Sequence, residues 1–154
     1  MPKVLFVCLG NICRSAIAEG ILIHKIKSHG LALSIDSAGT SNYHIGKAPD
    51  KRMQHKAIEH GLDIAYQRGR QFIVEDFDAF DYIFAMDESN KENILSLART
   101  SEDTNKVDLF LEQYHPHENK NVPDPYYGGN QGFEVVYQLL DLACDNFIKS
   151  LKNE

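Results

Sequence analysis

A cysteine lies six residues before an arginine and a serine, at the end of an apolar run. Cys8, Arg14 and Ser15 belong to the stretch VCLGNICRS. A cysteine thiolate is a strong nucleophile, and the planar guanidinium of arginine binds two oxygens of a tetrahedral oxyanion at once. A sulfur held beneath a bound phosphate has the geometry for in-line attack on phosphorus. The pattern therefore indicates phosphate-ester chemistry with Cys8 as the nucleophile.

The sequence around these residues favours a phosphate-binding loop after the first strand. Residues 4–8 are continuously apolar, as in a strand buried on both faces, and residues 15–29 read as a helix. Backbone N–H groups of a loop at a helix N-terminus can form an anion site, and their positive field favours the thiolate form of cysteine. Ser15 can donate a hydrogen bond to that sulfur. The predicted loop residues are Leu9, Gly10, Asn11, Ile12, Cys13 and Ser15, beside Cys8 and Arg14.

Gly10 and Asn11 fit a tightly curved loop. Gly10 lacks a side chain where the chain must bend, and Asn11 tolerates a left-handed backbone conformation better than most residues. A structural cysteine at a strand end is the alternative interpretation of Cys8, but it leaves Arg14 without a role.

Strand and helix patterns alternate along the rest of the chain. Further strands are predicted at residues 33–38, 80–86 and 106–111. Asp50 can cap a helix that ends before Gly61, a capping box at Ser89 and Glu92 can open another helix, and a last helix follows the loop at residues 121–132. Alternating elements predict an α/β fold with a parallel sheet, whose ligands bind at the carboxyl ends of the strands.

Composition limits the classes of protein. The 154 residues predict a single domain, 1–154, and a net charge of −6 disfavours nucleic-acid binding. Apolar runs are too short for a membrane span, and the N-terminus shows no secretory signal. Three cysteines do not make a disulfide framework and fit a reducing cytoplasm. An anionic substrate would need a local positive site acting against the overall charge.

Four stretches resemble one known family. VLFVCLGNICRS, DSAGTS, FDYIFAMDESN and VPDPYYGG, in this order over nearly the whole chain, resemble the low-molecular-weight protein tyrosine phosphatases. The resemblance implies a four-stranded parallel sheet with helices on both faces. It also implies that Cys8 is the nucleophile, Arg14 the phosphate clamp and Asp124 the general acid. Because Arg14 and backbone amides can neutralise the phosphate oxygens, no metal or other cofactor is expected.

The residues themselves give partial support to Asp124. It lies between Pro123 and Pro125, which restrict the backbone and hence the carboxylate. An ordinary turn is the alternative, and only the pairing with the cysteine loop favours catalysis.

The resemblance also assigns supporting roles. Asn11, Ser15 and Ser37 match residues that brace the loop, and Asp87 matches an acidic position behind the site. Tyr43 and Tyr126, with the adjacent Tyr127, match the walls of the substrate cleft. For these tyrosines the alternative is ordinary loop packing. For Asp87 the alternative is an ordinary position at the start of a helix.

Two positions depart from the family pattern. Ala16 stands where proline is usual, and Gln67 where a histidine often joins the bracing network, so the details of that network stay open. His60 matches a family histidine, with a surface or capping role equally compatible.

Cys13 has two interpretations. It is either a small buried residue at the helix start or a redox partner that protects oxidised Cys8 through a disulfide. Cys144 fits the core of the last helix. His115 and His117 fit a solvated loop better than a metal site.

The predicted function is hydrolysis of phosphotyrosine in protein substrates through a phosphocysteine, by a cytoplasmic monomer or weak homodimer. An arsenate reductase of the same fold is an alternative, but it needs a downstream cysteine pair and residues 80–100 contain no cysteine. A non-catalytic oxyanion-binding module is another alternative, although it would need neither a nucleophile nor an acid.

Overall fold

The computed structural model, which describes residues 1–125 and 129–153, contains one parallel sheet. Its strand order is β2-β1-β3-β4, with β1 in the interior of the sheet. The strands are β1 (Lys3–Cys8), β2 (Ser34–Gly39), β3 (Tyr82–Ala85) and β4 (Val107–Leu109). The predicted four-stranded parallel sheet is confirmed, and its carboxyl edge carries Cys8.

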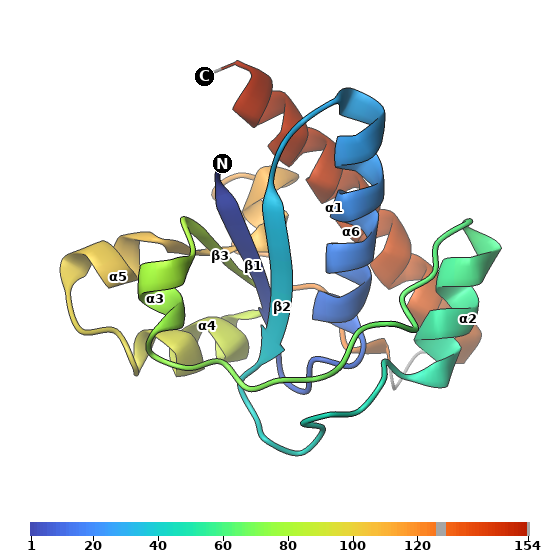
Figure 1. The fold of residues 1–154 in the computed structure, drawn as a ribbon, viewed down its shortest axis with the longest axis horizontal. Coiled ribbons are helices and arrows are strands. Elements are labelled where there is room, and N and C mark those ends of the chain that lie inside the picture. Colours follow the sequence, from blue (N-terminus) through green and yellow to red (C-terminus); the bar gives the residue numbers. More distant parts are fainter. Residues whose placement is uncertain (126–128, 154) are drawn as a thin grey trace.

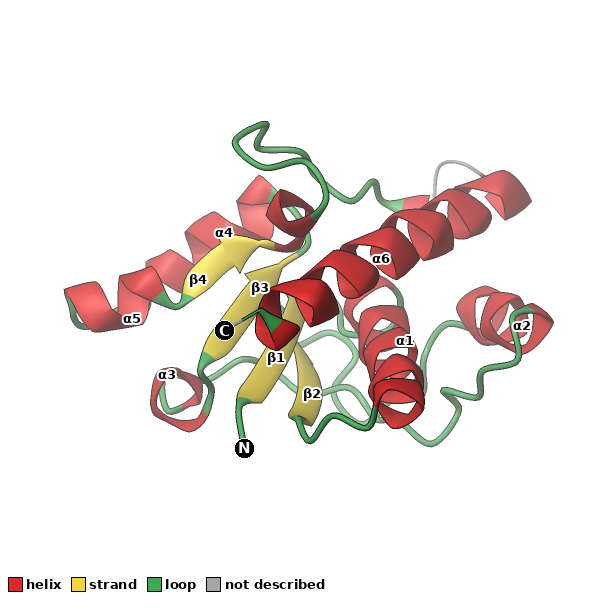
Figure 2. Ribbon diagram, turned by 90° about the horizontal axis from the view of Figure 1, so that it is seen from above, coloured by secondary structure: helices red, strands yellow, loops and turns green. Residues whose placement is uncertain are grey.

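Helices cover both faces of this sheet (Figure 1). One face packs against α1 (Arg14–His29) and α6 (Gly129–Lys152), and α2 (Lys51–Glu59) contacts α6. Figure 2 shows the other layer, with α3 (Asp76–Ala79) and α4 (Glu88–Leu95) across the sheet and α5 (Ser101–Asn105) beyond β4. A short 3₁₀ helix, η1 (Phe110–Gln113), follows β4. The expected helices on both faces are therefore present.

Strand β1 is buried on both sides. Val4 and Phe6 belong to the apolar cluster beneath α1 and α6, whereas Leu5 and Val7 belong to the cluster beneath α3 and α4. All four side chains are fully buried. Their uninterrupted apolar character follows from the period-two alternation of a strand between two helical layers.

Two helix starts were predicted from capping residues, and only one is confirmed. Asp50 caps α2 as expected, accepting a hydrogen bond from Arg52 N. The capping box at Ser89 is wrong, because α4 begins at Glu88 and Asp87 is its cap, with the carboxylate accepting from Asn90 N at 2.7 Å. Asp87, two residues after the end of β3, occupies the capping position and satisfies a free N–H group in place of Ser89.

The last helix begins earlier than the composition indicated. Residues 129–132 were expected in a loop, yet α6 starts at Gly129. Gly132 allows close packing there, because a Cβ at this position would lie 3.0 Å from the carbonyl oxygen of Pro125. None of the helices in the described ranges is long and apolar enough to cross a bilayer.

Candidate active site

The loop between β1 and α1 is fixed through its carbonyl groups. Thr40 N and Ser41 N donate to the carbonyl oxygens of Cys8 and Leu9, both at 2.9 Å. Asp50 N donates to the carbonyl oxygen of Ile12 at 2.7 Å. Segments after β2 thus hold the carbonyl side of the loop and leave its amide side for another partner.

The amide side of the loop has the character of an anion nest. Within the described chain, the backbone N–H groups of residues 9–13 donate no hydrogen bond to another residue. Asn11 has a φ of 57°, the left-handed conformation that the sequence predicted. Consecutive N–H groups without acceptors at the start of a helix form a positive concavity suited to a phosphate or similar oxyanion.

The close approach that shapes this loop depends on Gly39 rather than on Gly10. A Cβ at Gly39 would lie 2.7 Å from the carbonyl oxygen of Leu9 and 3.0 Å from Asn11 N, both backbone atoms. A Cβ at Gly10 would meet a side-chain carbon of His44 at 2.8 Å, and that ring can rotate away. Sequence reasoning missed Gly39, although a glycine ending a predicted strand was a visible signal.

Buried polar side chains brace the loop from behind. Asn11 Nδ2 donates to Ser15 Oγ and to Ser37 Oγ, both at 2.9 Å. Asn11 Oδ1 accepts from Arg70 N at 3.1 Å, and Ser15 Oγ lies 3.0 Å from Cys8 Sγ. The structure therefore connects Asn11, Ser15 and Ser37 in one network that reaches the sulfur.

Glu19 extends this network and was missed by sequence reasoning. Ser37 Oγ donates to Glu19 Oε1 at 2.6 Å, and Tyr66 OH donates to Glu19 Oε2 at 3.3 Å. Burial raises the pKa of Glu19 to about 7, although the Ser37 hydrogen bond acts to lower it. The available signal was an acid on the buried side of a predicted helix, four residues after Ser15.

Gln67 lies beside this network. Its Nε2 donates to the carbonyl oxygen of Ala16 at 3.0 Å, in the first turn of α1. Gln67 Oε1 is buried without a hydrogen-bond partner among the described residues. The residue at the family's histidine position thus supports the helix start and does not bond to the side chain of Asn11 or Ser37.

Arg14 is held by two partners. Its Nη1 donates to Asp87 Oδ2 at 2.7 Å and to the carbonyl oxygen of Val122 at 3.0 Å. Burial acts to lower the pKa of Arg14, but the charges of Cys8 and Asp87 outweigh it and raise the pKa, so the guanidinium stays charged. Asp87 therefore both orients the guanidinium and caps α4.

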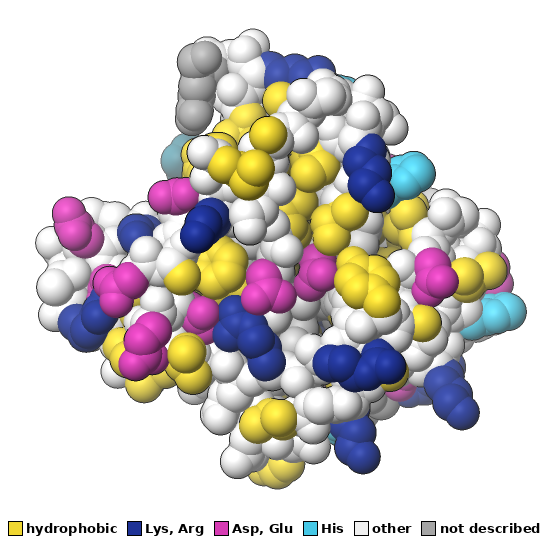
Figure 3. Space-filling model, in the orientation of Figure 1, with side chains coloured by type: hydrophobic (Ala, Val, Ile, Leu, Met, Phe, Trp, Pro, Cys, Tyr) yellow, Lys and Arg dark blue, Asp and Glu magenta, His cyan; other side chains and the backbone are white. Residues whose placement is uncertain are grey.

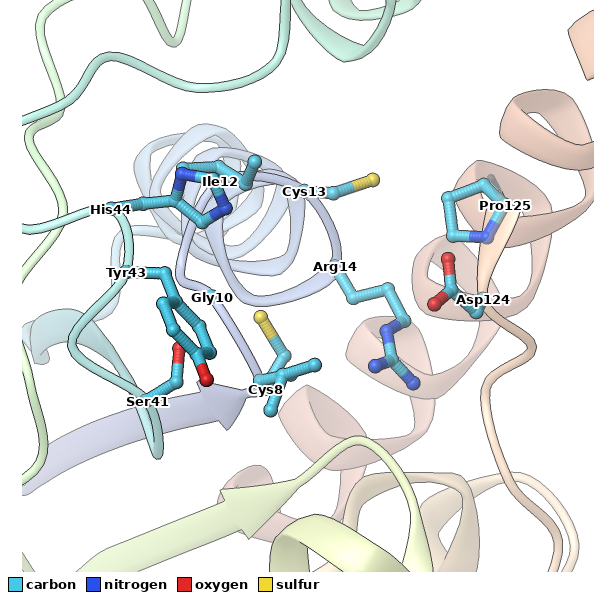
Figure 4. Close-up of a pocket in the computed structure, with 11 residues that line it drawn as sticks. Cys8, Gly10, Ile12, Cys13, Arg14, Ser41, Tyr43, His44, Asp124 and Pro125 are labelled. Carbon is cyan, nitrogen blue, oxygen red and sulfur yellow. The ribbon is translucent and has the colours of Figure 1, made fainter. Parts of the chain in front are cut away.

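Cys8, Arg14 and Asp124 line one cavity of about 360 Å³, together with other residues of the phosphate-binding loop and Tyr43. Cys8 is buried, and Figure 4 shows its sulfur directed into the cavity, with the Asp124 carboxylate beside the Arg14 guanidinium. Asp124 itself is exposed, and Tyr43, which is 80% exposed, lies at the mouth. Tyr126 and Tyr127, predicted as cleft walls, lie outside the described residues.

Two further cavity residues were not predicted. Ser41 and His44 line the same cavity as Tyr43, in the loop after β2. Their proximity in sequence to Tyr43 was the only available signal, because serine and histidine are ordinary loop residues.

The second loop cysteine differs chemically from the first. Cys13 is buried and lines the cavity, and Figure 4 shows its side chain directed away from Cys8. Burial, followed by the charge of Cys8, raises the pKa of Cys13 far above its ordinary value, so that it remains a thiol. Both cysteines are free, and the redox role of Cys13 stays a prediction. Cys144 is fully buried in the core, as expected.

The sequence and the fold both match a known class of enzyme. The family model for low molecular weight phosphotyrosine protein phosphatase matches residues 3–154. The chain belongs to this family. A putative low molecular weight protein-tyrosine-phosphatase of Synechocystis sp. is 47% identical over 154 residues, covering 99% of this chain and 98% of that protein.

Solved structures agree with this assignment. A protein tyrosine phosphatase of Entamoeba histolytica superposes with a TM-score of 0.92 and 39% identity, covering 99% of this chain and 98% of that one. A Drosophila arginine phosphatase superposes with a TM-score of 0.90 and 37% identity, covering 97% of this chain and 98% of that one. The fold is thus shared with phosphatases of known structure.

Proposed function

We propose that this protein removes phosphate from phosphotyrosine in protein substrates, with Cys8 as the nucleophile. The observation that carries the proposal is the convergence of the Cys8 sulfur, the Arg14 guanidinium and the Asp124 carboxylate on one cavity. Cleavage of a phosphate ester through a covalent intermediate needs a nucleophile, a cation and an acid that act on the same phosphate, and this cavity holds all three.

The first half-reaction transfers the phosphoryl group to sulfur. The Cys8 thiolate attacks phosphorus while the bond from phosphorus to the tyrosine oxygen breaks. Asp124 gives its proton to that oxygen, so that a neutral tyrosine leaves and a phosphocysteine remains. Arg14 and the amides of residues 9–13 bind the three equatorial oxygens, and the Ser15 hydroxyl, 3.0 Å from the sulfur, stabilises its negative charge.

The second half-reaction restores the enzyme. Asp124, now a carboxylate, takes a proton from a water molecule that attacks the phosphocysteine. The bond from sulfur to phosphorus breaks, inorganic phosphate leaves and the Cys8 thiolate is regenerated. One carboxyl group thus serves as acid and then as base, which an exposed side chain at the cavity mouth can do.

The depth of the cavity favours aryl phosphates. Cys8 is buried, so that the phosphate must extend inward on a long group, and Tyr43 at the mouth offers a ring for stacking, worth about 0.5–1.5 kcal/mol. A phosphoserine side chain is too short to bring its phosphate to the sulfur without drawing the peptide into the cavity. The likeness to the Drosophila arginine phosphatase makes phosphoarginine, which is also long, the informative competitor.

Hydrolysis of p-nitrophenyl phosphate in EDTA tests the proposal most simply. We expect turnover with the chelator present and none in Cys8→Ser, and kcat/KM should be higher for a phosphotyrosine peptide than for matched phosphoserine and phosphoarginine peptides. No hydrolysis by the unaltered protein would favour a non-catalytic oxyanion module. Equal kcat/KM for phosphotyrosine and phosphoserine would contradict the depth argument.

A further inference from the structure

Positive charge is concentrated in one segment of an acidic protein. Residues 40–70 contain six Lys or Arg and three Asp or Glu, a net charge of +3, whereas the remaining residues carry −9. This segment includes the loop that places Tyr43 and His44 in the cavity. A local excess of positive charge beside a substrate cleft attracts anionic groups that the rest of the surface repels.

Half of these six cations already have carboxylate partners. Arg52 pairs with Asp50, Lys56 with Glu59, and Arg70 with Asp76 and Asp36. The other three, Lys47, Lys51 and Arg68, are exposed, and no carboxylate of the described residues lies within ion-pair distance of them. We call these three residues the basic rim.

Backbone hydrogen bonds hold Lys47 and Arg68 next to the cavity. Gly69 N donates to the carbonyl oxygen of Lys47, and Gly46 N donates to that of Gly69, both at 2.8 Å. Lys47 N in turn donates at 3.0 Å to the carbonyl oxygen of His44, a cavity residue. Residues 46–47 and 68–69 are therefore adjacent on the His44 side of the mouth.

Lys51 lies at the start of helix α2, next to the phosphate-binding loop. It follows Asp50, whose N–H donates to the carbonyl oxygen of Ile12 in the phosphate-binding loop at 2.7 Å. Figure 3 shows several Lys and Arg side chains on the lower right of this face, over the loops on either side of α2. Lys47 and Arg68 thus border the cavity on the side of Tyr43 and His44, and Lys51 lies beside the contact between Asp50 and the phosphate-binding loop.

The opposite side of the mouth is acidic. Asp124 lines the cavity there, and Asp87 lies behind it against Arg14. Glu88 is tied to the same region, because its N–H donates to Asn121 Oδ1 at 3.0 Å. A peptide that crosses the mouth therefore meets cations on one side and carboxylates on the other.

Building on the proposed function, we propose that the basic rim binds acidic side chains that flank the phosphotyrosine of a peptide substrate. The enzyme then selects phosphotyrosines in acidic sequence. The rim cations have no protein carboxylates to displace. Arg68 Nη1 donates to the carbonyl oxygens of Ala65 and Gln67, both at 2.7 Å, but these neutral acceptors leave its charge uncompensated, so substrate carboxylates are attracted by three exposed charges. Such contacts act mainly on encounter and specificity, and they weaken as salt screens them.

The test compares three phosphotyrosine peptides that differ only in acidic, neutral or basic flanking residues. Each kcat/KM is divided by that for p-nitrophenyl phosphate, which has no flanking residues. The rim variant is Lys47→Gln/Lys51→Gln/Arg68→Gln. The matched control is Lys3→Gln/Lys27→Gln/Lys149→Gln, three exposed lysines at the far end of the sheet and late in helices α1 and α6. Both variants change the net charge equally, from −6 to −9.

We expect the unaltered enzyme to prefer the acidic over the neutral peptide by about tenfold at low salt. The control should keep this preference and the rim variant should lose most of it. The reversal variant Lys47→Glu/Lys51→Glu/Arg68→Glu should instead favour the basic peptide. The inference is overturned if the rim variant keeps the acidic preference, or if the control loses it equally. Absence of p-nitrophenyl phosphate hydrolysis by the unaltered protein would contradict the proposed function itself, and the inference with it.

Discussion

The phosphate-binding loop and the segment that carries Asp124 hold their side chains by different means. The loop, residues 8–15, is fixed by carbonyl contacts to the chain after β2 and by the Asn11–Ser15–Ser37 network behind it. In the acid segment, residues 121–125, the N–H of Val122 donates to the carbonyl oxygen of Met86 at 2.8 Å, and the carbonyl oxygen of Val122 accepts from Arg14.

This difference matches the two chemical tasks. The thiolate and the amides must be placed in advance, because the thiolate attacks in line with the bond that breaks and the amides stabilise negative charge on the phosphate oxygens. The acid must reach an oxygen on the leaving group and then a water molecule, and Asp124 is accordingly exposed at the mouth. We therefore expect that loss of the nucleophile in the loop abolishes catalysis. Loss of the acid should instead lower the rate by an amount that depends on the leaving group.

The largest expected effect is at the nucleophile. Cys8→Ser should reduce kcat by roughly four orders of magnitude or more, since a serine hydroxyl in this cavity has no base to activate it. Binding of vanadate should persist, because Arg14 and the amides of the loop remain. Calorimetric titration with vanadate checks the second point, and residual turnover above a tenth of the unaltered rate would contradict the role of Cys8.

A smaller and selective effect is expected at the acid. Asp124→Asn should lower kcat for phosphotyrosine by about 10²–10³, because a poor leaving group needs protonation. Activated aryl phosphates should lose much less. A series of substituted phenyl phosphates measures this, and a steeper dependence of the rate on leaving-group pKa in the variant is the expected result. An equal loss along the whole series would show that another group is the acid.

Two glycines give a matched test of loop geometry. Gly39→Ala places a Cβ 2.7 Å from the carbonyl oxygen of Leu9, so the loop must shift. We expect a destabilisation of about 1–3 kcal/mol and a loss of activity of at least tenfold. Gly10→Ala meets only the movable ring of His44 and should retain most activity. The free energy of urea unfolding and kcat/KM are measured for both variants. Equal losses at the two glycines would contradict the close approach inferred at Gly39.

The last prediction concerns the far end of the bracing network, where the expected effect is on the pH dependence of stability and not on a reacting group. Glu19 has a pKa of about 7 in the folded protein, above the ordinary 4.5, chiefly because of burial. Protonated Glu19 is therefore favoured in the fold, and stability present below pH 4.5 is lost as the pH rises through about 7. This loss is on the order of 3 kcal/mol.

Glu19→Gln should remove that part of the pH dependence, because the amide does not ionise. Urea midpoints measured from pH 4 to pH 8 should decline more in the unaltered protein than in the variant. Glu102→Gln, at an exposed position, serves as the control and should leave the profile unchanged. A variant profile that declines as steeply as the original would show that Glu19 is already ionised in the fold.

The two regions also differ in how far the sequence predicted them. The strand, the loop and the helix that follow one another around Cys8 are contiguous, so residue types and spacing were enough to predict these three elements. Asp124 approaches Arg14 only through tertiary packing, and a lone aspartate between two prolines is more often an ordinary turn than a catalytic residue. Gly39 and Glu19 were missed because their partners, Leu9 and Ser37, are distant in sequence, so the local signal at each residue did not show what it contacts.

Helix boundaries failed for a related reason. Ser89 and Glu92 match the sequence pattern of a capping box. Asp87, which is held by β3 and by its ion pair with Arg14, is nevertheless the residue that caps α4. The sequence around Gly132 is typical of a loop, but in the structure this glycine lies in α6 and packs against Pro125. In both places tertiary contacts override a local preference.

Trapping of the covalent intermediate tests the central claim most directly. The enzyme is mixed with p-nitrophenyl phosphate and quenched in acid within milliseconds, and peptides are then mapped by mass spectrometry. We predict phosphate on the peptide that contains Cys8 and on no other, and its amount should rise in Asp124→Asn if loss of the base slows hydrolysis more than transfer to sulfur. It should be absent in Cys8→Ser. Phosphate on a different residue, or full turnover with no phosphoenzyme under any quench time, would contradict Cys8 as the nucleophile.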